Sequence, residues 1–144
     1  MIQRIQSIFL LLASASYGSL FALPFARSKE SFGTAFADSM LNLHDKMGFI
    51  VLVAIGALTS FLAIFLFRNR KLQKTVTWVS VLLGFALSGF VYGVYDKIVA
   101  ENPSATINLD IGFGMPLISI VMGILAVVFI SKDDKLVKSM DRLR

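Results

Sequence analysis

The sequence predicts an all-α protein, a four-helix transmembrane bundle formed by a single integral membrane domain over residues 1–144. Four uncharged apolar stretches of more than twenty residues predict it, because about 20 helical residues cross the ~30 Å hydrocarbon core of a bilayer. All the acidic residues and all but one basic residue lie between or after these stretches, and 56% of the chain is hydrophobic. The predicted spans are 5–26, 47–67, 75–95 and 111–131, followed by a tail over 132–144.

The first stretch is the least apolar, because hydroxyl and small residues fill its second half and Pro24 lies near its end. Such residues let helices approach closely and form hydrogen bonds between them, so this half is expected to face other helices. A cleaved signal peptide is the alternative, with Arg4 as its basic region and Ala13–Ala15 as the cleavage site. Apolar character resumes after that site, which favours a retained span.

The second and third stretches are joined by a turn of only seven residues, Arg68–Lys74, which predicts antiparallel neighbouring helices. The third stretch carries small residues on two faces. Such faces predict close helix packing, either within the bundle or between two copies in a homo-oligomer. The predicted helix-packing residues are Ser80, Gly84 and Ser88 on one face, and Gly89 and Gly93 on the other.

The two longer connections, 27–46 and 96–110, are expected to carry short elements. A short interfacial helix is predicted in the first from apolar residues at helix-like spacing, namely Phe32, Phe36, Met40 and Leu43. Residues 105–111 alternate between apolar and polar, which predicts an extended segment in the second. The tail is predicted to form an amphipathic helix beginning with the capping-box pair Ser131 and Asp134. It would lie in the headgroup plane or extend the fourth helix into solvent.

Basic residues predict the orientation, because they accumulate on the cytoplasmic side of a membrane. Ten Lys and Arg residues lie before the first span, in the 68–74 turn and in the tail, whereas four lie in the connections 27–46 and 96–110. Both termini are therefore expected in the cytoplasm. The net charge of +5 is attributed to contacts with the lipid bilayer, and no nucleic-acid partner is expected.

Catalytic and metal sites need His, Cys, Asp or Glu side chains that converge in a pocket, and the four stretches contain none of them. The sequence therefore predicts no catalytic, cofactor-binding or metal-binding residue and no cofactor. The missing intramembrane acid argues against a small proton-coupled exporter, and the missing cysteine argues against a quinone-linked thiol oxidoreductase. The one histidine, His44, precedes Asp45 at the start of the second span. The pair would be either an acid–base or ligand group, or an ordinary charged helix start.

Three segments resemble a known family. They are the opening MIQRIQSIFLLL over 1–12, the basic RKLQ over 70–73 and the closing DKLVKSMDRLR over 134–144. They resemble an uncharacterised integral membrane family from Bacteroidetes-type bacteria, domain of unknown function 4293, and the resemblance covers the whole chain. It implies a four-helix protein of the bacterial inner membrane. It brings no known activity, so no functional residue is carried over.

The function expected first is non-enzymatic, a structural or accessory subunit of an inner-membrane assembly. Its partner would dock on a cytoplasmic patch formed by Arg4, Asp141, Arg142 and Arg144. A carrier or channel for a neutral or lipid-like substrate is the second hypothesis. Its weakly polar path would be lined by Ser14, Ser16, Tyr17, Ser19, Thr59, Ser60, Ser88 and Ser119. An enzyme acting on lipid at the outer face, using His44 with loop acids, is the third.

Overall fold

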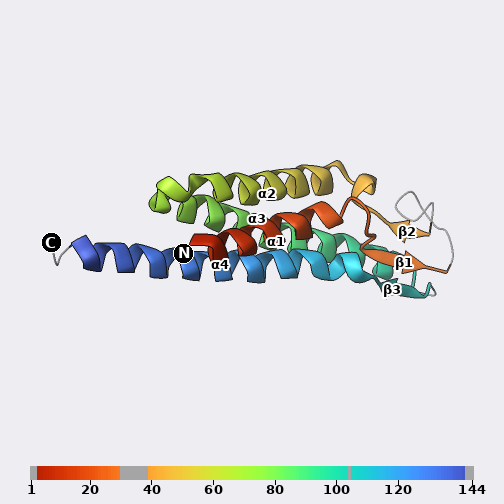
Figure 1. Ribbon diagram of the computed structural model, residues 1–144. Helices are drawn as coiled ribbons and strands as arrows, with labels where there is room; N and C mark the ends of the chain where they lie inside the picture. Colours follow the sequence, from red (N-terminus) through yellow and green to blue (C-terminus); the bar gives the residue numbers. More distant parts are fainter. Residues whose placement is uncertain (1–2, 30–38, 104, 142–144) are drawn as a thin grey trace.

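The computed structural model describes residues 3–29, 39–103 and 105–141 and forms a bundle of four helices (Figure 1). Each helix packs against two others, so that α1 contacts α2 and α4, and α3 contacts α2 and α4. The all-α four-helix bundle predicted from the apolar stretches is therefore confirmed. The helices are α1 (Gln3–Ser19), α2 (Met47–Phe65), α3 (Arg70–Glu101) and α4 (Ile111–Asp141).

A small antiparallel sheet joins the two longer connections at one end of the bundle, here called the sheet end (Figure 1). Its strand order is β2-β1-β3, with Ala26 paired to Leu41 on one side and to Leu109 on the other. The extended segment predicted within 105–111 is confirmed as β3. The other two strands were not predicted. The strands are β1 (Ala26–Ser28), β2 (Met40–Leu41) and β3 (Ile107–Leu109).

The first helix is shorter than its predicted span, ending at Ser19 rather than at residue 26. Its last amides bond three residues back, as in the Leu20 to Tyr17 bond of 3.2 Å, so the final turn tightens. Pro24 follows, and a proline disfavours helical backbone in the residue before it. The 17 residues of α1 measure about 26 Å, near the lower limit for crossing a bilayer.

The third and fourth helices are longer than their predicted spans, because charged residues ended the apolar stretches without ending the helices. The side chain of Asn69 caps α3 by accepting a hydrogen bond from the amide of Leu72 at 3.1 Å. That helix runs to Glu101, just before Asn102 and Pro103. Asp96 and Glu101, which were assigned to a loop, are therefore helical.

The predicted tail helix is part of α4, which continues without a break through Ser131 to Asp141. No new helix begins at Ser131, so the predicted capping-box start is not formed. The reason is local: residues 132–141 contain no glycine or proline that would interrupt the helix. This geometry matches the alternative in which the tail extends the fourth helix. Figure 1 shows α4 projecting beyond the other helices at the end opposite the sheet.

The predicted interfacial helix differs from what is observed. Met40 lies in β2 and Leu43 in a one-turn 3₁₀ helix, Leu43–Asp45, because the backbone of this segment pairs with β1. Phe32 and Phe36, which completed the predicted helix, lie outside the described residues.

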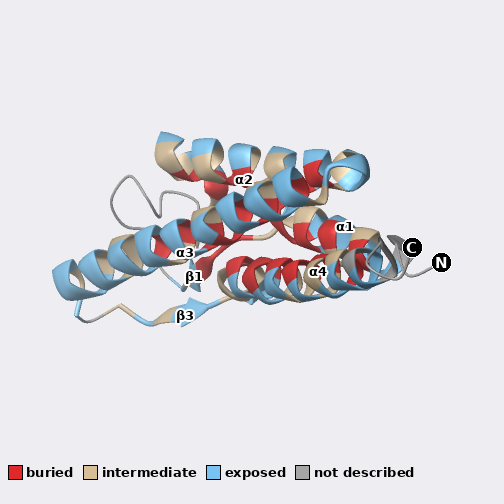
Figure 2. Cartoon of the chain, turned by 90° about the vertical axis from the view of Figure 1, so that its left-hand side faces the viewer, coloured by how far each residue is buried: buried red, intermediate tan, exposed pale blue. Residues whose placement is uncertain are grey.

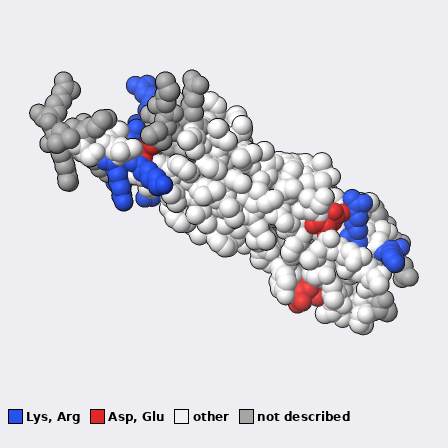
Figure 3. Space-filling model, turned by 60° about the horizontal axis from the view of Figure 1, so that its bottom comes forward, with Lys and Arg blue, Asp and Glu red and all other residues white. Residues whose placement is uncertain are grey.

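The outer surface of the bundle is apolar along most of its length. Buried residues face inward between the helices, as Figure 2 shows, while Leu82 on α3 is 63% exposed and Leu58 on α2 is 59% exposed. Charged side chains gather at the two ends of the face shown in Figure 3, with an uncharged band between them. Among the described residues, α2, α3 and α4 are long and apolar enough to cross a membrane, and α1 forms a shorter apolar helix.

Candidate functional site

The centre of the bundle is occupied by the side chain of Tyr17, which is fully buried. Its hydroxyl donates a hydrogen bond to the backbone carbonyl of Ser80 on α3 at 2.7 Å. The hydroxyls of Ser60 on α2 and Ser80 lie 2.5 Å apart, and Ser60 also donates to the carbonyl of Gly56 at 2.9 Å. Hydrogen bonds therefore link α1, α2 and α3 at the middle of the bundle, where each polar group is shielded from water.

Two glycines provide the space for the Tyr17 ring and hydroxyl. A Cβ atom at Gly56 would lie 2.8 Å from two atoms of the ring. A Cβ atom at Gly84 would lie 2.8 Å from the Tyr17 hydroxyl, 2.7 Å from Cγ1 of Ile120 and 3.3 Å from the hydroxyl of Ser119. Since Ile120 and Ser119 belong to α4, all four helices meet at this point, here called the Tyr17 junction.

The predicted helix-packing residues fall into two groups. Ser80 and Gly84 lie in the Tyr17 junction. Ser88 is partly buried, donates to the carbonyl of Gly84 at 2.9 Å and borders an apolar crevice of about 180 Å³ between α3 and α4. Gly89 and Gly93 are exposed, and a Cβ atom at either would have no described neighbour within 4 Å. Their contact with another chain stays a prediction.

The hydroxyl groups proposed to line a transport path bond instead to helix carbonyls. Ser14 donates to the carbonyl of Ala57 at 3.2 Å and thereby ties α1 to α2. Ser119, Ser16, Ser19 and Thr59 each donate to a carbonyl three or four residues earlier in their own helix. Tyr17 and Ser60 belong to the Tyr17 junction, so this set does not form one continuous lining among the described residues.

A second polar layer lies toward the end of the bundle away from the sheet. Gln6 on α1, Gln73 on α3 and Asp133 on α4 are buried, and each has one side-chain oxygen without a hydrogen-bond partner among the described residues. Gln73 donates through Nε2 to the carbonyl of Ala63 at 2.9 Å. The backbone carbonyl of Asp133 accepts a hydrogen bond from Arg70 at 2.7 Å. The sequence did not predict that these residues are buried, because single polar residues beside a charged segment carry no distinctive spacing.

A pocket lies at this same end, where the turn between α2 and α3 faces α4. Its volume is about 650 Å³, within the usual range for small-molecule sites. Three of its lining residues are basic and one is acidic. The lining residues are Phe67, Arg68, Asn69, Arg70 and Lys71 from the turn and Asp134 and Val137 from α4. We call this pocket the basic pocket and this end of the bundle the basic end.

The predicted docking patch is only partly described. Arg4 and Asp141 lie near the start of α1 and at the end of α4, both at the basic end (Figure 1). Arg142 and Arg144 lie outside the described residues. The patch therefore stays a prediction.

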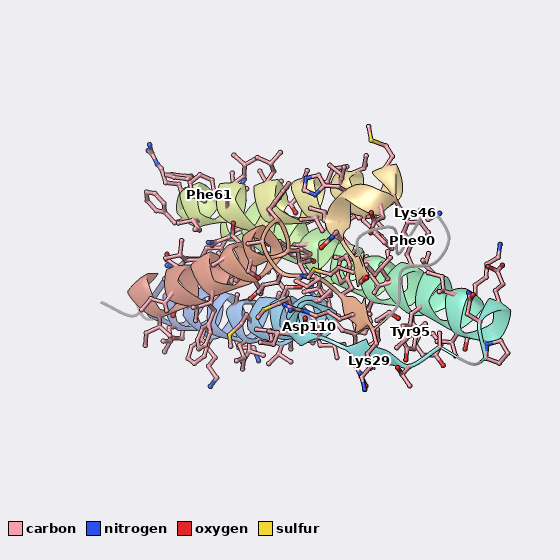
Figure 4. The ribbon with its side chains drawn as sticks, turned by 90° about the vertical axis from the view of Figure 1, so that its right-hand side faces the viewer. Lys29, Lys46, Phe61, Phe90, Tyr95 and Asp110 are labelled. Atoms are coloured by element: carbon pink, nitrogen blue, oxygen red, sulfur yellow. The ribbon has the colours of Figure 1, made fainter. Side chains whose placement is uncertain are left out.

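The sheet end is held by an ion pair between Arg27 on β1 and Asp110, which immediately precedes α4. Figure 4 places Asp110 beside the sheet and Phe61 toward the other end of α2. The amide of Ile111 donates to Asp110 at 2.7 Å, and this bond, followed by the hydrogen bond and charge of Arg27, lowers the pKa of Asp110 from its ordinary value. The Arg27 side chain is exposed and that of Asp110 is partly buried, so water weakens the ion pair and the contacts arrange the loop more than they stabilise the fold.

His44 and Asp45 do not form an acid–base pair in this structure. The exposed His44 ring packs edge-on against Phe21, with the ring centroids 6.4 Å apart. Asp45 accepts a hydrogen bond from the backbone amide of Asn42 at 2.5 Å, as a residue of a helix start does. Within the described residues, no group of three or more His, Cys, Asp or Glu residues is placed to hold a metal ion.

Comparisons with known proteins identify one family. The model of the family described as "Domain of unknown function (DUF4293)" matches residues 2–143. No curated protein and no solved structure matches the chain.

Proposed function

The chain belongs to the family described as "Domain of unknown function (DUF4293)", and for this member we propose a non-enzymatic role as a small structural or accessory subunit of a membrane assembly. Its place would be the bacterial inner membrane, with both termini in the cytoplasm. The positive-inside distribution of basic residues supports that orientation, since the start of α1, the basic pocket and the end of α4 share one end of the bundle.

The Tyr17 junction is the observation that carries this proposal. A carrier must alternate between two arrangements of its helices around a substrate site. In this bundle the central space is filled by an aromatic ring that is bonded to α3 and closely surrounded by Gly56 and Gly84. Interiors packed in this way resist continuous deformation. A fixed bundle suits a subunit that holds a partner in place better than one that moves a substrate.

The projecting part of α4 supports a docking role at the basic end (Figure 1). Leu136 and Val137 are exposed there, next to the charged end of the chain. Apolar side chains on a helix that extends past its bundle form a surface that a partner would cover. The partner would contact these residues together with the predicted patch of Arg4, Asp141, Arg142 and Arg144.

The test is affinity purification of the tagged protein from its own membranes in mild detergent, followed by mass spectrometry. We expect a stoichiometric partner that is lost when Asp141, Arg142 and Arg144 are replaced by alanine. Replacing the exposed Lys46 and Lys97, at the opposite end, should leave that partner bound. A homo-oligomer without other subunits, combined with substrate flux into liposomes above that of empty vesicles, would refute the accessory role and favour the carrier.

A further inference from the structure

The basic pocket lies where the apolar surface of the bundle meets its charged end. The apolar residues of α2 and the following turn continue to Phe67, which is 49% exposed, and Arg68 comes next in the chain. In a protein whose helices cross a membrane, such a transition marks the level of the lipid headgroups. The pocket is therefore open to whatever occupies the headgroup layer beside α2 and α4.

The charges of the lining residues define what the pocket attracts. Arg68, Arg70 and Lys71 contribute three positive charges and Asp134 one negative charge, so the lining has a formal charge of 3 − 1 = +2. The side chains of Arg68 and Lys71 are exposed and have no hydrogen bond or ion pair within the described part of the chain. An anion would supply the partner that these two cations lack.

Arg70 gives the pocket a fixed donor. One guanidinium nitrogen donates to the carbonyl of Asp133 on α4 at 2.7 Å, which holds the side chain across the gap between the turn and α4. A guanidinium group has five N–H donors, so others remain for a ligand. The start of α3, whose side-chain cap is Asn69, adds the partial positive charge of a 32-residue helix on the same side of the pocket.

The lining also contains two apolar residues, which distinguishes a lipid from a free anion. They are Phe67 from the turn and the 37% exposed Val137 from α4. A phosphodiester with acyl chains would place its phosphate against the cations and its glycerol and first methylenes against Phe67 and Val137. Inorganic phosphate would leave these two apolar residues uncovered.

We propose that the basic pocket binds the phosphate of an anionic phospholipid from the leaflet beside it. Arg70 and Arg68 pair with the phosphate oxygens, because guanidinium groups bind phosphate through two parallel hydrogen bonds. Lys71 adds a point charge, and Phe67 and Val137 contact the glycerol region.

The experiment titrates the detergent-solubilised full-length protein with dioctanoyl phosphatidylglycerol and, separately, with dioctanoyl phosphatidylcholine, and counts bound lipid by native mass spectrometry. We expect phosphatidylglycerol to bind more tightly. The double variant Arg68→Gln/Lys71→Gln should weaken phosphatidylglycerol binding roughly twenty-five-fold, because each basic residue near an anionic lipid contributes about fivefold. It should leave phosphatidylcholine binding unchanged, which also shows that the variant is folded.

The matched control is Lys74→Gln/Lys135→Gln, which removes the same charge from exposed residues at the basic end that do not line the pocket. This variant should lose little affinity. An equal loss in both variants would show general electrostatic attraction and overturn the proposal, as would equal binding of the two lipids. Displacement of the lipid by inorganic phosphate at millimolar concentration would assign the site to a free anion. Loss of a co-purifying acidic protein in the first variant, with lipid binding unchanged, would assign it to a protein partner.

The lipid site is measured on the isolated protein, so a negative result there would leave the accessory role untouched. Equally, a missing protein partner would not affect the lipid titration.

Discussion

Replacing Gly84 with alanine should destabilise the bundle, whereas the same change at Gly89 should not. Both glycines lie in α3 and five residues apart, so the gain in helix propensity, about 1 kcal/mol, applies equally to both variants. The difference between the two free energies of unfolding therefore measures packing alone.

The structure sets the size of that difference. The added methyl group at Gly84 would lie 2.7 Å from Cγ1 of Ile120 and 2.8 Å from the hydroxyl of Tyr17, both too close for an unstrained contact. Tyr17 is fully buried and its hydroxyl is hydrogen-bonded to the carbonyl of Ser80, so the side chain cannot shift away from the added methyl group. Overpacking of this kind costs about 1–3 kcal/mol. At Gly89 the methyl group meets no described atom within 4 Å and costs nothing.

The assay is reversible unfolding in mixed micelles with increasing sodium dodecyl sulfate, followed by the fluorescence of Trp78, which is the one tryptophan in the chain. We expect Gly84→Ala to be less stable than Gly89→Ala by about 1–3 kcal/mol. Equal stabilities, with neither variant less stable than the unsubstituted protein, would refute the claim that the Tyr17 junction is closely packed. A comparable loss in Gly89→Ala would instead mean that Gly89 packs against another chain, as the small-residue pattern allows.

Three further changes test other parts of the structure. Tyr17→Phe removes the central hydrogen bond and should cost about 0.5–1.5 kcal/mol in the same unfolding assay, and an unchanged stability would contradict the observed bond. Gly112→Ala places a methyl group against the backbone carbonyl of Pro24, so this variant should unfold more easily than Gly114→Ala, whose methyl group meets no described atom within 4 Å. The reverse order of stabilities would argue against the observed start of α4. Arg27→Gln should raise the pKa of Asp110 in a carboxyl NMR titration, though only in part, because the amide of the next residue contributes more to the lowered value. The pKa of Asp110 is lowered in the folded protein, so the stability that this contact gives is present above about pH 4 and is lost as the pH falls through the pKa of the folded state. An unchanged Asp110 pKa in Arg27→Gln would refute the ion pair.

The glycines of α3 show where prediction from the sequence reached its limit. Small residues at four-residue spacing occur on two faces of this helix, and both faces fit the pattern of close packing equally well. Of the two faces, the one with Gly84 packs against Tyr17 from α1 and Ile120 from α4, whereas Gly89 and Gly93 on the other face have no described neighbour within 4 Å of an added Cβ atom. Spacing within one helix says which residues share a face, but the position of the neighbouring helices decides which face they cover.

The sheet and the basic pocket show the same limit over longer distances. Ala26 ends the first predicted span and Arg27 begins a connection, yet the backbone of Ala26–Ser28 pairs with Met40–Leu41 and with Ile107–Leu109. Likewise, the charges of Arg68 and Lys71 predict the orientation in the membrane from the sequence alone, whereas their place in a pocket depends on α4 passing beside the turn. The extended segment at 107–109 was predictable because its alternation of apolar and polar residues is local.

The sequence by itself determined that this protein is a helical bundle with long apolar helices and charged ends, because hydropathy and helix length are properties of continuous stretches of chain. The tertiary structure alone decided where α1 ends, that α4 continues through the tail, which glycines are packed and which polar groups meet. These features depend on contacts between residues far apart in the sequence, such as Tyr17 with Ser80 and Arg70 with Asp133, and their energies do not exist until the helices are assembled.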